Sequence, residues 1–274
     1  MATKRTCRKC KLTKQPLALV LIQTRFSPIS NLDKYIPDIQ DKLRRNGFPY
    51  MTARKGTAFE LSPAGIQPTI IDQWVFDTAD RRTSVIMDGR QVLLQSTSYD
   101  TFEPFLAQYL VVLNIVMKIT EHDKFGICDR LGLRYIDQVV KQDKEDSIDS
   151  YLRPELRGMT SSFFLTDKKR YAFTNVVTTQ LPSKETASLS MRIYRNNDTL
   201  DLPPDVYAGA PPRLRIIDTS DDFALIDMDH GCTVRSGPGI QKDALEKLFF
   251  RLHDVIIEVF YESVVSEEGM QKWK

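Results

Sequence analysis

The stretch Leu17-Ala-Leu-Val-Leu-Ile22 contains six consecutive apolar or small side chains, and polar residues alternate only after it, at Gln23 and Arg25. A strand that is apolar on both faces is typical of the middle of a sheet, because both of its faces are buried. Pro28 and Ser30 end this strand. The sequence therefore predicts a sheet in which residues 17–22 form a central strand.

Further strands are expected along the rest of the chain, mostly joined by short connections. They are predicted at residues 57–61, 69–76, 83–87, 91–95, 127–140, 162–181, 187–194, 213–218 and 222–228. Asp88-Gly89 is the strongest hairpin signal, because this dipeptide accepts the positive φ angles of a tight turn. Most connections are too short to hold a crossover helix, so the strands are expected to be antiparallel. The predicted fold class is α+β, a mainly antiparallel sheet packed against a few helices.

Two long amphipathic helices are predicted, and each ends one half of the chain. Residues 100–120 and 241–264 carry apolar side chains three and four positions apart, which is the spacing of one helix face. A shorter helix is expected from about Asp33 to the stop signal Asn46-Gly47. These helices would cover the apolar face of the sheet.

The composition is that of an ordinary globular protein. Of 274 residues, 42% are hydrophobic and 27% are charged, values that disfavour disordered, collagen-like and coiled-coil classes. No apolar run reaches the length of about 18 residues that a membrane span needs, and the basic N-terminus lacks the apolar region of a secretory signal. Four cysteines, two of them isolated, do not suggest a disulfide framework. We therefore expect a cytoplasmic protein without membrane contact.

Positive charge is concentrated at the N-terminus. Residues 1–14 contain six cationic side chains and no acid: Lys4, Arg5, Arg8, Lys9, Lys11 and Lys14. Because the formal net charge is +2, the remaining 260 residues carry −4. Residues 1–14 are predicted to form a flexible basic arm, which is either solvated or contacts nucleic-acid phosphates. Residues 15–274 are predicted to form a single unit, and two packed halves, 15–122 and 123–274, are the alternative.

Cys7 and Cys10 have the spacing of half a zinc site, because a two-residue gap lets both thiolates reach one tetrahedral ion. No second pair of this kind follows. Only Cys128, Cys232 or a distant histidine would complete the ligands. Free thiols without a cofactor are the favoured interpretation, and a structural zinc ion is the alternative.

Asp227 and Asp229 follow an apolar strand, and the two-residue step places both carboxylates on one face. Such a pair is able to hold Mg²⁺, as phosphoryl-transfer enzymes require. The favoured interpretation is an exposed strand end whose carboxylates bond to backbone or arginine. His230 beside them is expected to be a hydrogen-bonded structural residue, with ligand binding as the alternative.

A second candidate for metal chemistry consists of Glu155, Asp167 and Lys169. Spaced acids followed by a lysine are typical of restriction-type nuclease cores, in which the acids bind metal and the lysine positions the attacking water. This pattern is short and common by chance. The favoured interpretation is a turn with a basic tip.

The stretch Arg130-Leu-Gly-Leu-Arg-Tyr-Ile-Asp137 is a predicted strand with polar side chains on both faces. Alternation places Tyr135 and Asp137 on one face and Arg134 on the other. An arginine inside a strand is exposed or paired with an acid, and the 227–229 motif offers candidate partners. A structural network is therefore favoured. The alternative is a ligand site that uses these three side chains and His230.

Five segments together carry a family resemblance. They are Pro16–Pro28, Tyr35-Ile-Pro37 with Gly47-Phe-Pro49, Arg130–Asp137, Leu225–His230, and Leu252-His-Asp254 followed by Phe260 and Ser266-Glu-Glu268. They resemble a sporadically distributed, functionally uncharacterised bacterial family, similar in length to residues 15–274, whose pattern usually has asparagine where this chain has Asp137. The resemblance excludes the Cys7/Cys10 arm and brings no catalytic residues. The patchy distribution is similar to that of mobile-element and phage-defence genes, which implies a process of that kind.

The sequence favours a non-enzymatic binding or assembly protein. Phosphate-binding, dinucleotide-binding, nucleophile-elbow and zinc-protease motifs are absent from it, and it contains three histidines. The expected partner is a second copy of the chain or an operon-encoded protein. One alternative is a metal-dependent nuclease or phosphoesterase that uses the acids named above. The other is a nucleic-acid-binding subunit that uses the basic arm.

Overall fold

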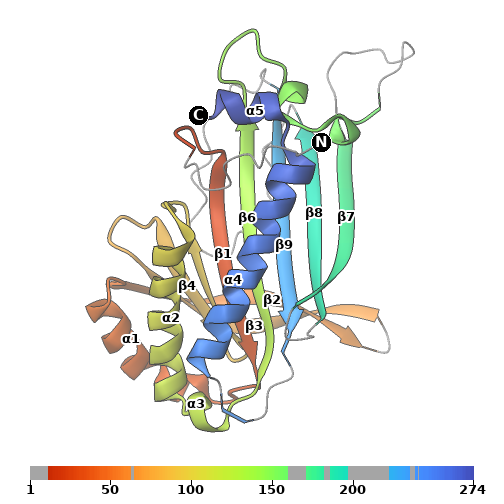
Figure 1. The fold of residues 1–274 in the computed structure, drawn as a ribbon. Coiled ribbons are helices and arrows are strands. Elements are labelled where there is room, and N and C mark those ends of the chain that lie inside the picture. The colour runs from red at the N-terminus through yellow and green to blue at the C-terminus, as the bar shows by residue number, and fades with distance from the viewer. Residues whose placement is uncertain are drawn as a thin grey trace.

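One antiparallel sheet organises the structure, a computed structural model that describes residues 12–62, 65–159, 171–181, 186–196, 222–234, 238–239 and 241–274. Its described strands are β1 (Leu17–Phe26), β2 (Tyr50–Ser62), β3 (Gly65–Asp77), β4 (Thr83–Asp88), β5 (Gln91–Ser96), β6 (Cys128–Val140), β7 (Tyr171–Gln180), β8 (Thr186–Asn196) and β9 (Phe223–Thr233). In space they follow the order β2-β3-β4-β5-β1-β6-β9-β8-β7 (Figure 1). The predicted α+β class with an antiparallel sheet is confirmed.

The described helices are α1 (Ile36–Arg45), α2 (Phe102–Ile119), α3 (His122–Phe125), α4 (Lys242–Val259) and α5 (Glu267–Lys272). Short 3-10 helices cover Leu32–Tyr35, Ile148–Tyr151 and Pro154–Leu156, and a π-helical turn, Phe260–Val264, continues α4. The two long predicted helices correspond to α2 and α4. Part of the predicted 162–181 strand and the whole predicted 213–218 strand lie outside the described residues.

Strand β1 lies in the interior of the sheet, as its sequence predicts. It pairs with β5 on one side and with β6 on the other. Val20 and Ile22 are buried on one face, and Leu19 and Leu21 are buried on the other. Burial on both faces explains why this segment has no polar alternation.

The two halves of the chain repeat one arrangement around the middle of the sheet. The first half supplies β1, then the strands β2 to β5, and then α2. The second half supplies β6, then β7 to β9, and then α4. In each half the last strand pairs with the first, and β1 pairs with β6 where the halves meet. A single sheet therefore spans both halves.

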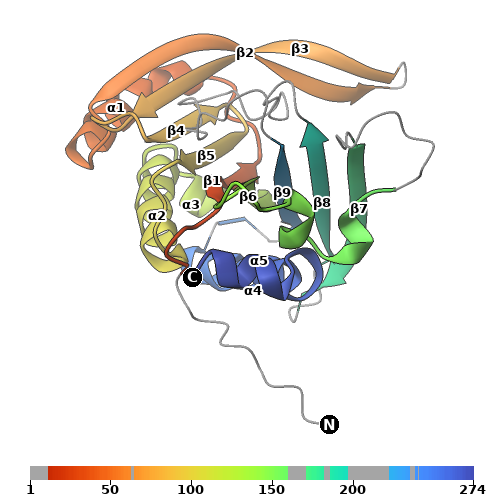
Figure 2. The same cartoon turned by 90° about the horizontal axis from the view of Figure 1, so that it is seen from above.

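Helices α2 and α4 cover one face of the sheet (Figure 2). Their apolar residues join the main core together with β1 and β6, and the rings of Tyr109 and Phe249 meet edge to face at 5.6 Å. Among the described helices, α2 alone has the length and apolarity of a membrane span. Leu106, Tyr109 and Val116 of α2 are buried against the core, which is the usual position of a core helix and is compatible with a soluble protein.

The hairpin of β2 and β3 extends beyond the rest of the sheet. The two strands pair along their whole length, whereas β3 pairs with β4 only through Trp74–Asp77. The outer part of the hairpin arches over the face that α4 does not cover (Figure 2). The sequence predicted shorter strands here, because residues 50–56 are largely exposed and lack an apolar alternation.

The end of the predicted basic arm belongs to the body. Leu12 is buried, and the Lys14 backbone N–H donates to the Trp273 carbonyl oxygen at 3.1 Å. Trp273 is itself 1% exposed. Lys14 is therefore fixed by its backbone against the C-terminal segment, which corrects the predicted limit of the arm. Residues 1–11 lie outside the described residues.

Candidate functional site

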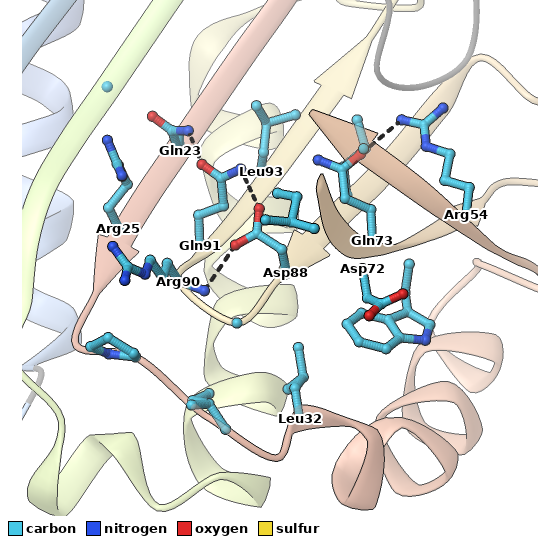
Figure 3. Close-up of a pocket in the computed structure, with 18 of the residues that line it drawn as sticks. Gln23, Arg25, Leu32, Arg54, Asp72, Gln73, Asp88, Arg90, Gln91 and Leu93 are labelled. Atoms are coloured by element: carbon cyan, nitrogen blue, oxygen red, sulfur yellow. Dashed lines mark hydrogen bonds between the residues drawn. The ribbon is translucent and has the colours of Figure 1, made fainter. Parts of the chain in front are cut away.

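The sheet face opposite α2 and α4 carries a cavity of about 1170 Å³, which the β2–β3 hairpin helps to line (Figure 3). Alternation along β1 determines which side chains reach it. Val20 and Ile22 join the core under the helices, whereas Leu21, Gln23 and Arg25 line the cavity. The cavity is therefore lined by both apolar and polar side chains from the same strands.

A chain of polar contacts crosses five neighbouring strands in this cavity. Asp88 of β4 accepts a hydrogen bond from Gln91 Nε2 of β5 at 2.6 Å, and Gln91 Oε1 accepts one from Gln23 Nε2 of β1. Gln23 Oε1 accepts from Arg130 Nη1 of β6 at 3.0 Å. Arg130 Nη2 lies 3.8 Å from Asp229 Oδ1 of β9. We call Asp88, Gln91, Gln23, Arg130 and Asp229 the polar ladder; Figure 3 shows its first part.

Two glycines leave the space that the Arg130 guanidinium occupies. Gly132 and Gly231 lie directly opposite each other on β6 and β9. A Cβ on Gly231 would lie 2.5 Å from Arg130 Nη2, and a Cβ on Gly132 would lie 3.2 Å from Arg130 Nη1. The guanidinium therefore lies over backbone that carries no side chains, within reach of Gln23.

Asp227 forms a buried ion-pair network next to the ladder. Arg134 Nε and Nη2 donate to the two carboxylate oxygens of Asp227 at 2.7 and 2.8 Å. Arg192 Nη1 donates to the same carboxylate at 3.1 Å. Asp227 is fully buried and Arg134 nearly so. The predicted pairing of Arg134 with an acid of the 227–229 motif is confirmed, but the predicted exposed strand end is wrong for Asp227, which is buried inside β9.

The cavity lining carries an excess of positive charge. Its described cations are Arg25, Arg54, Lys55, Arg90, Arg130 and Arg134, and its acids are Asp33, Asp72, Asp88 and Asp229. The lining thus has a formal charge of +2, while residues 15–274 together carry −4. Burial raises the pKa of Asp88 above its usual value. The local charge therefore favours an anionic ligand.

The hairpin contributes a donor that no described residue satisfies. Arg54 Nη2 donates to Gln73 Oε1 at 3.5 Å, and Figure 3 shows the two side chains together. Arg54 Nε is buried and has no hydrogen-bond partner in the described part of the chain. Buried donors normally have an acceptor, so this nitrogen is a position where a ligand oxygen would be stabilised.

Tyr135 and Asp137 lie on the opposite face of β6 from Arg134, among the helices. The Tyr135 hydroxyl lies 3.2 Å from the Tyr99 hydroxyl and 3.0 Å from His253 Nδ1. The His253 ring stacks on Phe102 at 4.1 Å. Burial lowers the pKa of His253 to about 4 and raises that of Asp137 to about 7. The structure therefore separates these two predicted binding residues from Arg134 by the thickness of the sheet.

His230 is also buried on the helix side of the sheet. Its Nε2 lies 3.0 Å from Thr179 Oγ1, and its Nδ1 lies 3.0 Å from the Leu252 carbonyl oxygen. Burial lowers the pKa of this histidine. Both ring nitrogens are engaged, so the structural interpretation of His230 fits its geometry better than a role as a ligand-binding residue.

The predicted metal ligands do not converge within the described residues. No group of three or more His, Cys, Asp or Glu side chains positioned for a metal ion occurs there. Glu155 is exposed in a 3-10 helix. Cys128 and Cys232 are buried, and burial raises the Cys128 pKa to about 12, which disfavours the zinc-binding thiolate. Asp167, Lys169, Cys7, Cys10 and the arm cations Lys4, Arg5, Arg8, Lys9 and Lys11 lie outside the described residues.

The polar ladder itself was missed in the sequence. Gln23 and Arg25 mark the point where an apolar strand becomes polar, and Gln91 follows the Asp88-Gly89 turn. Polar residues at alternate positions of otherwise buried strands are the available signal. That signal does not identify which strands are neighbours, so it does not bring these side chains together.

Comparison with known protein families and with curated proteins finds no match for this chain. The bacterial family resemblance therefore stays a prediction.

Proposed function

We propose that the chain is a non-enzymatic, cytoplasmic binding protein whose ligand site is the cavity between the sheet and the β2–β3 hairpin. The polar ladder is the observation that carries this proposal. It places five hydrogen-bonding side chains in one row on the floor of an open cavity. Side chains of this kind in an open cavity offer donors and acceptors to a polar ligand.

The chemistry of the lining favours binding over catalysis. Asp227 belongs to the predicted metal-binding pair. Its carboxylate instead accepts hydrogen bonds from Arg134 and Arg192. Asp229 lies at the end of the ladder next to Arg130. The described lining contains no histidine or cysteine that would serve as a base or nucleophile. Self-association, an operon-encoded partner and a role in defence or mobile elements stay predictions from the sequence.

A thermal-shift screen with a library of small polar metabolites tests this proposal. Ligands that bind the native cavity should raise the Tm, because binding to the native state alone stabilises it by mass action. Gln91→Leu breaks the ladder at its second residue and should abolish these shifts. Gln271→Leu, at an exposed position of α5, is the matched control and should retain them.

Mass spectrometry of the recovered ligand completes the test. A ligand that returns unchanged after prolonged incubation supports a non-enzymatic role, whereas conversion to a product contradicts it. Equal Tm shifts in the wild type and in Gln91→Leu would place binding outside the cavity. A library without any stabilising member would count against the proposed function.

A further inference from the structure

A smaller pocket of about 230 Å³ lies at one end of the cavity. It is lined by Arg25, Phe26, Pro28, Arg90, Asp129 and Arg130. Four of these residues, the three arginines and Pro28, also line the larger cavity, so the two spaces adjoin. The small pocket thus brings together three guanidinium groups and one carboxylate.

The fold brings the three arginines together from separate parts of the chain. Arg25 of β1 and Arg130 of β6 lie at directly opposite positions of an antiparallel pair. The Phe26 N–H donates to the Arg90 carbonyl oxygen at 2.9 Å, which fixes the β4–β5 turn next to the end of β1. Figure 3 shows Arg25 and Arg90 at this end of the cavity.

Two of the three arginines, Arg25 and Arg130, form no hydrogen-bonded ion pair within the described residues. Like charges at directly opposite strand positions destabilise a sheet, and Arg25 has no hydrogen bond or ion pair within the described part of the chain. Arg130 is oriented by Gln23, but its 3.8 Å separation from Asp229 exceeds hydrogen-bond distance. Arg25 and Arg90 are exposed and Arg130 is partly exposed, so all three guanidinium groups are accessible to an anion that enters the pocket.

The number and type of the donors indicate the anion. Planar guanidinium groups bind phosphate oxygens with paired hydrogen bonds. Three arginines and Asp129 give the pocket lining a formal charge of +2. A phosphate dianion neutralises this charge, whereas a carboxylate neutralises only half of it. The pocket has room for a phosphate group, and the polar ladder continues from Arg130 into the larger cavity.

We propose that Arg25, Arg90 and Arg130 form the phosphate subsite of the cavity, and that the ligand is a phosphorylated small molecule whose polar body lies along the ladder. This inference rests on the proposed function, because it assigns a ligand class to the same cavity. A nucleic-acid backbone offers the same phosphate chemistry, and the experiment below distinguishes it from a small molecule.

Isothermal titration with inorganic phosphate and pyrophosphate, at matched ionic strength, tests the subsite. We expect both probes to bind the wild type, and Arg25→Gln and Arg90→Gln each to weaken binding at least tenfold. Arg251→Gln is the matched control, because Arg251 is exposed on α4 on the other side of the sheet. Unchanged Tm values would show that Arg25→Gln and Arg90→Gln remain folded.

The other outcomes separate this inference from the proposed function. Phosphate affinity that is equal in wild type, Arg25→Gln and Arg90→Gln overturns the subsite. If the metabolite screen yields only ligands without a phosphate, and they are lost in Gln91→Leu, the cavity function stands and the phosphate inference fails. Single-stranded oligonucleotide binding that is tighter than pyrophosphate binding and is lost in Arg25→Gln overturns the assignment to a small molecule.

Discussion

Arg134 and Asp227 form a bidentate ion pair across β6 and β9, with N–O distances of 2.7 and 2.8 Å. Both side chains are buried, and register places Arg134 directly opposite Asp229 and Asp227 directly opposite Ile136. The pair is therefore diagonal, and Arg192 on β8, directly opposite Asp227, completes it from the other side. One carboxylate thus ties three neighbouring strands together.

Arg134→Met should destabilise the protein strongly. Removing one partner leaves a buried carboxylate with only Arg192, and loss of a buried ion-pair partner costs about 3–5 kcal/mol. The free energy of unfolding is measured by urea titration at pH 7. Arg192→Met is the matched control and should cost less, because its side chain is partly exposed and donates one bond to Asp227 at 3.1 Å. Equal effects of the two substitutions would contradict a buried Arg134–Asp227 pair.

The sequence predicts this pair because an arginine inside a strand needs an acid, and the 227–229 motif is a nearby source. It also predicts the central β1, the α+β class and the two long helices, since these follow from local apolar patterns. It does not predict the polar ladder, whose residues come from five strands and meet only through the strand order and register. Neither property is determined by local periodicity.

Asp137→Asn should stabilise the protein above neutral pH. Burial raises the pKa of Asp137 to about 7, and the carboxyl makes no hydrogen bond within the described part of the chain. The native state therefore holds a proton that the unfolded chain has lost, so stability falls as pH rises from about 4 to 7. An uncharged amide of the same shape avoids this penalty, which is about 4 kcal/mol for a pKa raised from 3.8 to about 7.

Urea unfolding of the wild type and of Asp137→Asn at pH 4.5 and pH 8 measures the difference. The two proteins should have similar stability at the lower pH and should differ most at the higher pH. A difference that is independent of pH would contradict a titrating Asp137.

His253→Phe should remove a pH dependence of stability that has the opposite sign to that of Asp137. Burial lowers the pKa of His253 to about 4, so the unfolded chain gains a proton between pH 6.5 and pH 4 that the native state resists. Wild-type stability should therefore fall through this range by up to about 1.4 kcal/mol per pH unit from this group. Phenylalanine retains an aromatic ring beside Phe102 and cannot titrate, so the variant should lose this slope.

The measurement for His253 is best made in the Asp137→Asn background. Asp137 contributes a slope of the opposite sign over the same pH range, and the two contributions partly cancel in the wild type. In that background, stability should decrease on acidification with His253 and should lose this decrease with phenylalanine. A slope that persists in His253→Phe would assign the titration to another group.

Gly231→Ala should lower the affinity for phosphate clearly while it changes the Tm little. The added Cβ would lie 2.5 Å from Arg130 Nη2 and 3.0 Å from the Leu131 carbonyl oxygen, so the flexible guanidinium must move away from Gln23. Gly132→Ala is the matched comparison, because its Cβ would approach Arg130 no closer than 3.2 Å. We expect phosphate affinity to fall at least fivefold in Gly231→Ala and to change less in Gly132→Ala, with Tm values recorded for both. If Gly231→Ala retained full phosphate affinity, Arg130 would not need its present position over the two glycines to bind the anion.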